Sequence, residues 1–209
     1  MKAKRRAFEA IHLPIETPRL HLVTPTARFV REYRTLLNDE GVSKWLLRVP
    51  FPYRARDGAE FVQRARRSWR SGEALALTIV HGTTGHVIGG IGLHGISWEH
   101  RHAEVGYWIG RPHWGLGYAS EAVGALLTES FETLHLHRVE AGVFRGNSGS
   151  VNVLRKAGFR PEGVRREAFW RRGEWLDDLA FGLTESEWRR RRALSTGEEP
   201  PRGWAGSQS

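Results

Sequence analysis

The segment that most constrains the fold of this chain is residues 105–122, in which an apolar run leads through a glycine loop into a helix. Gly115 and Gly117 lie in the loop, and a helical pattern begins at Tyr118. The first turn of a helix offers unpaired N–H groups and the positive end of the helix dipole. Glycine also lets the backbone approach a ligand closely. This order of elements therefore predicts a cradle for a phosphate or pyrophosphate group.

Three interpretations of this loop compete. A P-loop needs Lys and then Ser or Thr after its last glycine, whereas Tyr118 and Ala119 follow Gly117. A dinucleotide-binding turn, written Gly115-x-Gly117-x-x-Ser120, has Ser where Gly or Ala is required. Its fold also begins with alternating strands and helices, whereas the strands predicted at 75–81, 86–93 and 103–109 follow one another without a helix before this loop. A tight turn without a ligand is the third interpretation, and the loop alone leaves it open.

The rest of the chain predicts a mixed α/β fold. Period-two alternation marks strands, and apolar residues spaced for one helical face mark helices. Helices are predicted at 26–37, at 57–69 with Asp57 as the cap, at 118–134 and at 148–157. Strands are predicted at 19–23, 75–81, 86–93, 103–109, 138–143, 159–169 and 175–183.

Length and composition predict one domain with two tails. The 209 residues can bury a sizeable core. We expect a basic N-terminal extension at 1–15, a domain at 16–188, and an Arg-rich and then flexible tail at 189–209, although the run Arg189 to Arg192 also suits the last turn of a helix. The formal net charge of +9 suits anionic ligands or simply a solvated surface.

Several protein classes are excluded or disfavoured by composition. The absence of cysteine excludes disulfides and thiolate chemistry. Apolar runs are too short to span a membrane, and the basic N-terminus lacks the apolar region of a signal peptide. We therefore expect a cytoplasmic protein that does not bind membranes.

Four stretches of the chain, in order, form a recognisable set: Ala103-Glu104-Val105-Gly106-Tyr107-Trp108-Ile109, the loop at 114–119, Asn147-x-x-Ser150 with Lys156-Ala157-Gly158-Phe159, and Gly173-x-Trp175-x-Asp177. Together they resemble the Gcn5-related N-acetyltransferase (GNAT) superfamily, and within it the Rim-type branch that includes ribosomal-protein alanine N-acetyltransferases. The family's loop, Gln/Arg-x-x-Gly-x-Gly/Ala, is similar to residues 114–119, with Trp114 in place of Gln/Arg. The resemblance implies a GNAT fold: a central mixed, mostly antiparallel sheet, splayed at the acetyl-CoA site and flanked by helices.

The resemblance also implies which residues would bind the cosubstrate, acetyl-CoA. The loop Trp114, Gly115, Leu116, Gly117, Tyr118 and Ala119 would hold the pyrophosphate through backbone N–H groups. The strand end Trp108-Ile109-Gly110 would pair with the pantetheine arm, as a peptide adds to a sheet edge. Asn147 would hydrogen-bond this arm, and Lys156 would either meet the adenosine 3′-phosphate or be a solvated helix residue.

Acetyl transfer requires a neutral amine, a stabilised oxyanion and a proton donor for the leaving thiolate. In this family a backbone N–H near Ile109 would bind the oxyanion. Ser150 would donate toward the sulfur, unless it is only a helix cap or a surface serine. Glu104 would accept the amine proton through water, unless it is a sheet-surface carboxylate. His94, His100 and His102 lie near the acceptor mouth, with His102 as the first alternative base; no histidine shows metal-binding spacing, and the reaction needs no metal.

The acceptor is predicted to be a primary amine. A protein α-amine has a pKa of about 7.7–8.0, against about 10.4 for lysine, and is thus more often neutral. A protein N-terminus, with ribosomal proteins as candidates, competes with polyamines, amino sugars and amino acids. Trp45, Phe51 and Tyr53 of the 41–53 loop are expected to form one acceptor wall or merely a packed lid.

Two other classes of function compete with the enzyme. A non-catalytic acetyl-CoA-binding domain would need neither Glu104 nor Ser150, and both residues are present. An RNA- or ribosome-binding module would need an aromatic-and-basic motif that this chain lacks, so direct nucleic-acid binding is not expected. Either a monomer or a homodimer fits the sequence.

Overall fold

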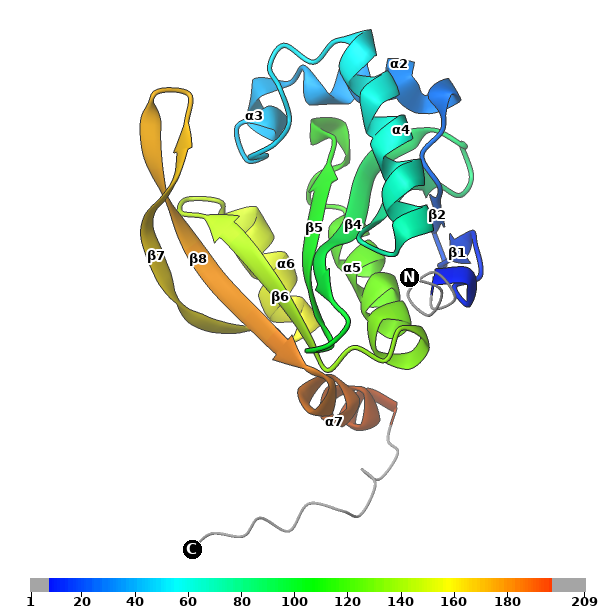
Figure 1. Ribbon diagram of the computed structural model, residues 1–209, viewed down its shortest axis with the longest axis vertical. Coiled ribbons are helices and arrows are strands. Elements are labelled where there is room, and N and C mark those ends of the chain that lie inside the picture. The colour runs from blue at the N-terminus through cyan, green and yellow to red at the C-terminus, as the bar shows by residue number, and fades with distance from the viewer. Residues whose placement is uncertain (1–7, 197–209) are drawn as a thin grey trace, which may run out of the picture.

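The computed structural model describes residues 8–196, and within that range eight strands form one sheet (Figure 1). The spatial order is β1-β2-β3-β4-β5-β6-β8-β7. Neighbouring strands run antiparallel except β5 and β6, which are parallel. The strands are β1 (Ile15–Glu16), β2 (Leu20–Val23), β3 (Leu75–His81), β4 (Val87–Ser97), β5 (His102–Ile109), β6 (Arg138–Phe144), β7 (Arg160–Arg171) and β8 (Glu174–Thr184).

Helices flank this sheet on both sides. They are η1 (Ala27–Phe29), α2 (Val30–Leu37), α3 (Glu40–Ser43), α4 (Ala55–Ser71), η2 (Arg111–His113), α5 (Tyr118–Thr128) with its π-helical continuation η3 (Glu129–Thr133), α6 (Ser148–Ala157) and α7 (Glu185–Thr196). The mixed, mostly antiparallel sheet with flanking helices confirms the predicted fold class.

The prediction that Asp57 caps helix α4 is wrong, because the helix begins two residues before Asp57. The helix begins at Ala55, and Arg54 is the extended residue before it. Asp57 is the third helical residue, and its carboxylate accepts a hydrogen bond from the Arg54 backbone N–H at 2.6 Å. An acidic residue at the third helical position stabilises a helix start by accepting the N–H of the residue that precedes the helix. Asp57 therefore stabilises the first turn of α4, although it is not the cap residue.

Two hydrophobic clusters cover opposite faces of the sheet. Neighbouring residues of β3 belong to different clusters: Ile79 packs with the apolar face of α5, and Val80 packs with α2. Adjacent side chains of a strand point to opposite faces, so α5 and α2 cover opposite sides of the sheet, as Figure 1 shows. The sheet is therefore the central layer of three.

The two ends of the described chain are packed elements. Phe8 and Ile11, within the predicted extension, are buried in the main core. The run Arg189 to Arg192 is helical, but it lies in the middle of α7 (Glu185–Thr196) and not in the last turn, where the helical alternative placed it. Residues 1–7 and 197–209 lie outside the described range. Among the described helices, none is long and apolar enough to cross a membrane.

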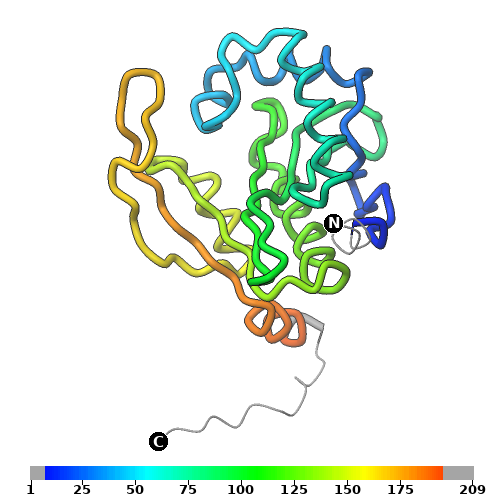
Figure 2. The backbone as a smooth tube through the Cα atoms, viewed as in Figure 1, coloured from blue at the N-terminus to red at the C-terminus, as the bar shows by residue number. Residues whose placement is uncertain are grey.

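The sheet opens between its two parallel strands. The paired residues of β5 and β6 are His102 to Glu104 and Arg138 to Glu140. Beyond Glu104 the register of β5 continues only toward β4, while β6 pairs with β8 along its whole length. Figure 2 shows the β7–β8 hairpin extending past the end of β6 at the far edge of the sheet. The strand edges from residue 105 onward are thus separated, as the predicted splay requires.

Candidate active site

The predicted phosphate loop is a tight turn that exposes backbone. Gly115 and Gly117 have φ angles of 75° and 83°, in the left-handed region that favours glycine. Gly117 immediately precedes α5, and its carbonyl accepts the Glu121 N–H at 3.1 Å. A Cβ placed on Gly115 would meet nothing within 4 Å, so the space above this residue is open. The geometry suits an anion that approaches the first turn of α5.

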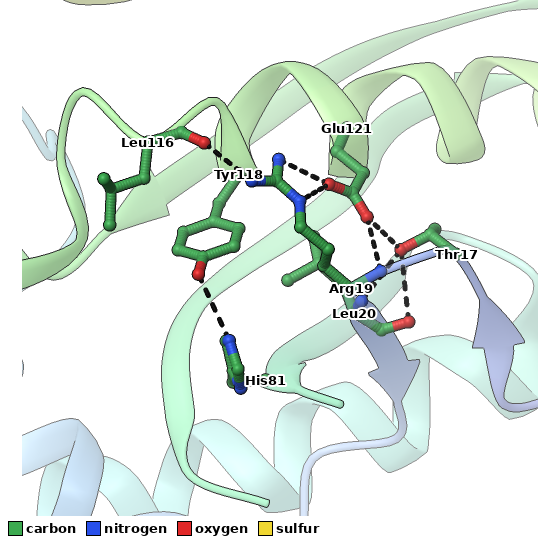
Figure 3. Close-up of polar contacts among 7 residues, drawn as sticks. All are labelled: Thr17, Arg19, Leu20, His81, Leu116, Tyr118 and Glu121. Atoms are coloured by element: carbon green, nitrogen blue, oxygen red, sulfur yellow. Dashed lines mark hydrogen bonds and ion pairs between the residues drawn. The ribbon is translucent and has the colours of Figure 1, made fainter. Parts of the chain in front are cut away.

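Arg19 of the segment before β2 braces this loop (Figure 3). Its guanidinium forms an ion pair with Glu121 at 2.7 Å and donates to the Leu116 carbonyl at 3.0 Å. It also lies 4.6 Å from the centre of the Tyr118 ring. The Thr17 hydroxyl donates to the same Glu121 carboxylate at 2.7 Å. Sequence analysis missed this brace, because 102 residues separate Arg19 from Glu121.

Hydrogen bonds keep Glu121 ionised. Burial alone would raise the pKa of this carboxyl, but hydrogen bonds from Thr17 and Arg19 outweigh it and lower the pKa. The Tyr118 hydroxyl meets His81 of β3 at 3.1 Å, which ties the start of α5 to the sheet. The loop and the start of α5 are therefore held by the segment before β2 and by the end of β3, both of which lie far from them in sequence.

Trp114, at the position of the family's Gln/Arg, connects the loop to the end of β5 through its indole ring. Its indole N–H donates to the Ile109 carbonyl, the last residue of β5, at 2.6 Å. The side chain is otherwise half exposed. Trp108, Ile109 and Gly110 thus lead directly into the loop, with the Gly110 N–H bonded to the Ile88 carbonyl at 2.8 Å.

Ser150 lies beside a tyrosine that sequence analysis did not select. The Tyr107 hydroxyl of β5 is 2.8 Å from Ser150 Oγ. Burial raises the pKa of Tyr107 to about 12, against a hydrogen bond from Ser150 that lowers it. Tyr107 lies on the same face of β5 as Ala103 and Val105, the face that packs against α5 and α6. The alternation of residues 103, 105 and 107 could have identified it from sequence. Asn147 caps α6, its side-chain oxygen accepting the Ser150 N–H at 3.1 Å.

Glu104 lies on the opposite face of β5, among basic groups. Its carboxylate oxygen is 3.5 Å from Nε2 of His94 on β4. The hydrogen bond with His94 lowers the pKa of Glu104, although burial raises it. The charges of His94, Arg165 and Arg48 lower this pKa further. Among the three histidines predicted near the acceptor mouth, His94 therefore contacts Glu104, whereas the rings of His100 and His102 stack on each other at 6.3 Å.

A cavity of about 280 Å³ lies between α2, α4 and residues 48–53, and Glu104 is not among the residues that line it. Trp108, which shares a face of β5 with Glu104, forms one wall, and Tyr33, Tyr53 and Phe61 add further aromatic surface. Arg48, whose charge acts on Glu104, lines the same cavity. The predicted wall from the 41–53 loop is thus represented in the cavity by Tyr53.

The other two aromatic residues of that loop lie elsewhere. Trp45 is close to Gly146, where a Cβ would meet its ring at 3.6 Å. Phe51 lies beneath the guanidinium of Arg172, 4.7 Å from its ring centre. Of the three aromatic residues in the predicted wall, Tyr53 therefore borders the cavity that Trp108 lines, together with Arg48, Val49 and Pro50 of the same loop.

Two arginines at the tip of the β7–β8 hairpin join the hairpin to helix α3. Arg171 is buried, and its guanidinium donates to the carbonyls of Ser43 at 2.6 Å and Lys44 at 2.9 Å. Arg172 donates to the Ser43 hydroxyl at 3.1 Å. We call this pair the arginine clasp. The clasp therefore holds the tip of the β7–β8 hairpin against the end of α3.

Lys156 lies at the end of α6 and lines a second groove, with residues of α5 and α7. In the described part of the chain, no group of three or more His, Cys, Asp and Glu side chains is arranged to hold a metal ion.

Comparison with known proteins agrees with this architecture. Residues 19–160 match the family described as "Acetyltransferase (GNAT) domain". The uncharacterized N-acetyltransferase p20 of Bacillus licheniformis is 35% identical over 153 residues, which are 72% of this chain and 84% of that protein. The putative ribosomal N-acetyltransferase YdaF of Bacillus subtilis is 30% identical, over 72% of this chain and 82% of its own length.

A solved structure shows the same fold. RimJ of Mycobacterium smegmatis, in complex with CoA-disulfide, has a TM-score of 0.76 at 23% identity, over 90% of this chain and 92% of that one. The chain therefore belongs to the GNAT family and is an N-acetyltransferase enzyme that uses acetyl-CoA. This confirms the family resemblance, including its Rim-type branch.

Proposed function

We propose that this enzyme acetylates the N-terminal α-amine of a protein, with ribosomal proteins as the first candidates and residues 16–188 as the acetyltransferase domain. The observation that carries this proposal is the lowered pKa of Glu104 beside His94. A carboxylate with a low pKa is a weak base. It suits an amine with a pKa of about 7.7–8.0, which is often neutral already, better than a lysine near 10.4.

The cosubstrate occupies the loop and the splayed strands in this proposal. The backbone N–H groups of Gly115 to Ala119, including Leu116, Gly117 and Tyr118, bind the pyrophosphate, and Trp114 begins the loop. The pantetheine arm pairs with the free edge of β5 at Trp108, Ile109 and Gly110, and the amide nitrogen of Asn147 donates to it. The open space at Gly115 and the separation of β5 from β6 support this placement.

In this proposal the two faces of β5 have different roles: Glu104 on one face receives a proton, and Tyr107 on the other face contacts Ser150. The neutral amine nitrogen attacks the thioester carbonyl carbon, and the developing oxyanion accepts a backbone N–H near Ile109. The C–S bond then breaks as the C–N bond forms. The amine loses its proton through water to Glu104, and CoA departs as a thiolate that accepts a hydrogen bond from the Ser150 hydroxyl, which contacts Tyr107. We expect the arginine clasp, which fixes the hairpin tip against α3, to favour an acceptor that is an exposed chain end.

A small amine is the second candidate acceptor. The cavity lined by Trp108, Tyr33 and Tyr53 has a volume of about 280 Å³, which suits an amine attached to an apolar group. Asp57 and Glu60 line this cavity together with Arg48 and Arg64, so charges of both signs face it and they do not rank a polyamine against an amino acid or amino sugar.

A matched set of acceptors tests the proposal. One peptide carries a free N-terminal alanine and an internal lysine, and a second is identical except for a blocked α-amine. Spermidine and glucosamine are included, and product mass and CoA release are measured together. We expect acetylation of the free α-amine and little reaction of the blocked peptide. Faster transfer to the lysine or to a small amine would contradict the assignment of the acceptor.

A further inference from the structure

Asp178 of β8 carries a buried carboxylate that has no role in the proposed reaction. Its side chain is 2% exposed, and its Oδ2 accepts hydrogen bonds from Nε and Nη2 of Arg165 on β7, at 2.8 and 2.5 Å. The side chain of Arg165 itself remains 57% exposed. A buried carboxylate is costly to leave without its partner, so Asp178 fixes the position of a cation that faces solvent.

The sheet register places this ion pair on the same face as Glu104. Glu104 of β5 lies opposite Glu140 of β6, and Gly142, two residues further along β6, shares the face of Glu140. A Cβ placed on Gly142 would meet Oδ1 of Asp178 at 2.7 Å, so the Asp178 carboxylate covers this point of β6. The guanidinium of Arg165, which is bonded to that carboxylate, therefore lies on the Glu104 face of the sheet.

Arg165 has donors to spare, whereas the neighbouring carboxylates are already paired. Glu140 and Glu162 both form ion pairs with Arg138. A guanidinium has five N–H groups, and those of Arg165 that do not bond to Asp178 have no hydrogen-bond partner within residues 8–196. Arg165 can therefore bind an anionic group that comes from outside the protein.

The pKa of Glu104 agrees with this placement. The hydrogen bond with His94 is the largest influence that lowers this pKa, and the charge of Arg165 lowers it further. A charge that acts on the Glu104 carboxylate can also act on a substrate beside that carboxylate. The acceptor and the Arg165 guanidinium thus share one face of the sheet.

We propose that Arg165 binds an anionic group of the acceptor, so that the enzyme prefers a chain end whose second or third residue is acidic. This inference rests on the proposed function, in which Glu104 receives the proton of the acceptor α-amine. Guanidinium groups form strong, directional hydrogen bonds with carboxylates. Asp178 is a positioning residue here, since it holds the guanidinium and does not touch the acceptor.

The spacing along the sheet suits such an acceptor. Glu140, which lies opposite Glu104, and Gly142, which lies beneath the Asp178 carboxylate, are about 7 Å apart along β6. An extended acceptor chain covers that distance in about two residues. An amine at Glu104 and a carboxylate at Arg165 can therefore belong to the same chain end.

Two pairs of peptides test the proposal on the full chain. Every peptide begins with a free N-terminal alanine, and the members of a pair differ only in having Asp or Asn, at the second residue in one pair and at the third in the other. The wild-type enzyme should show a kcat/KM about tenfold higher for Asp than for Asn at one of these positions, because the amide loses a charge-assisted contact.

Variants of the ion pair test which residue is responsible. The double variant Arg165→Gln with Asp178→Asn leaves no buried charge unpaired and should abolish the preference for Asp. Asp178→Asn alone should weaken the preference by raising KM for the Asp peptide, with kcat little changed, because the guanidinium is held less firmly. Arg166→Gln, exposed on the same hairpin, is the matched control and should keep the preference.

The ratio of the two rates within one variant separates recognition from folding, because a variant that folds less well loses activity on both peptides equally. Equal kcat/KM for Asp and Asn at both positions in the wild-type enzyme would overturn the proposal and leave acetylation of the α-amine intact. An undiminished preference in the double variant would also overturn it. Acetylation of none of the peptides would instead contradict the proposed acceptor and, with it, this inference.

Discussion

The hydroxyl of Tyr107 on β5 lies 2.8 Å from Oγ of Ser150 and also donates to the Ser150 carbonyl at 3.2 Å. The two residues join the splayed strand to the first turn of α6. Burial raises the pKa of Tyr107 to about 12, although the hydrogen bond with Ser150 lowers it. The phenol therefore remains protonated throughout the range in which an amine acceptor titrates, and we expect the pair to serve the leaving thiolate.

Ser150→Ala and Tyr107→Phe should each lower kcat by about 10- to 100-fold. This is at or below the lower end of the rate contribution that a positioned acid or base typically makes. Because Tyr107 stays protonated, the loss should persist at the same size from pH 7 to about 9.5. The double variant should lose little more than one single variant, since the two hydroxyls act together. Steady-state pH–rate profiles measure this. A loss that disappears at high pH would contradict the assignment.

Glu104→Gln should show the opposite pH dependence. We expect kcat to fall by about 100-fold or less, with CoA affinity nearly unchanged. His94 lowers the pKa of Glu104, so this carboxylate is ionised at neutral pH and above. The defect should shrink as pH rises, because water then deprotonates the amine. A flat defect through the amine pKa would end the base assignment, and His94, which contacts Glu104, would replace the sequence-based alternative His102.

Glu121→Gln should lower both thermal stability and CoA affinity, since it breaks the brace with Arg19 and Thr17. The stability loss should be about 1–2 kcal/mol. The folded-state pKa of Glu121 is depressed, so the stabilisation is present above the unfolded pKa near 4.5 and is lost as pH falls. The difference in Tm between wild type and variant should therefore shrink below about pH 4.

Glu60→Gln is the control for this measurement. The Glu60 pair with Arg64 is exposed and 3.9 Å long, so its loss should change stability by about 0.5 kcal/mol or less. Equal Tm changes in the two variants would show that the brace at Glu121 has no special effect.

Gly117→Val should weaken CoA binding strongly in a folded protein. Gly117 has a φ of 83°, and a β-branched residue there is strained and would crowd the predicted pyrophosphate cradle. Gly85→Val is the matched control, because Gly85 has a φ of 69° in the turn between β3 and β4. Both should lose stability, and only Gly117→Val should lose the rise in Tm on addition of CoA. NAD should raise Tm in neither protein.

Arg171→Lys should relax acceptor selectivity. An ammonium group cannot donate to the Ser43 and Lys44 carbonyls with the geometry of a guanidinium. The ratio of kcat/KM for a free α-amine peptide to that for lysine in the blocked peptide should fall several-fold. Arg166→Lys, exposed on the same hairpin, is the control. An unchanged ratio with a lowered Tm would mean that the clasp is structural only.

The loop could be predicted from sequence because its geometry is local. Gly115 and Gly117 adopt positive φ angles just before a helix that starts at the predicted residue, Tyr118. Helix α6 likewise spans the predicted residues, with Asn147 as its cap. Strand β3 matches its predicted range. In each case the signal lies within a few neighbouring residues, since caps, glycines and apolar alternation act over one or two turns.

The partners of the site residues were decided only by the tertiary structure. Arg19 meets Glu121 because β2 and α5 pack together, and the clasp forms because the hairpin reaches α3. Sequence patterning along β5 places Glu104 and Tyr107 on opposite faces, but it does not say that His94 or Ser150 stands opposite them. The alternation of residues along a strand determines the face to which a side chain points. The residue that it contacts there depends on the register and packing of elements distant in sequence. The chemistry of the site therefore depends on contacts between segments that share no local signal.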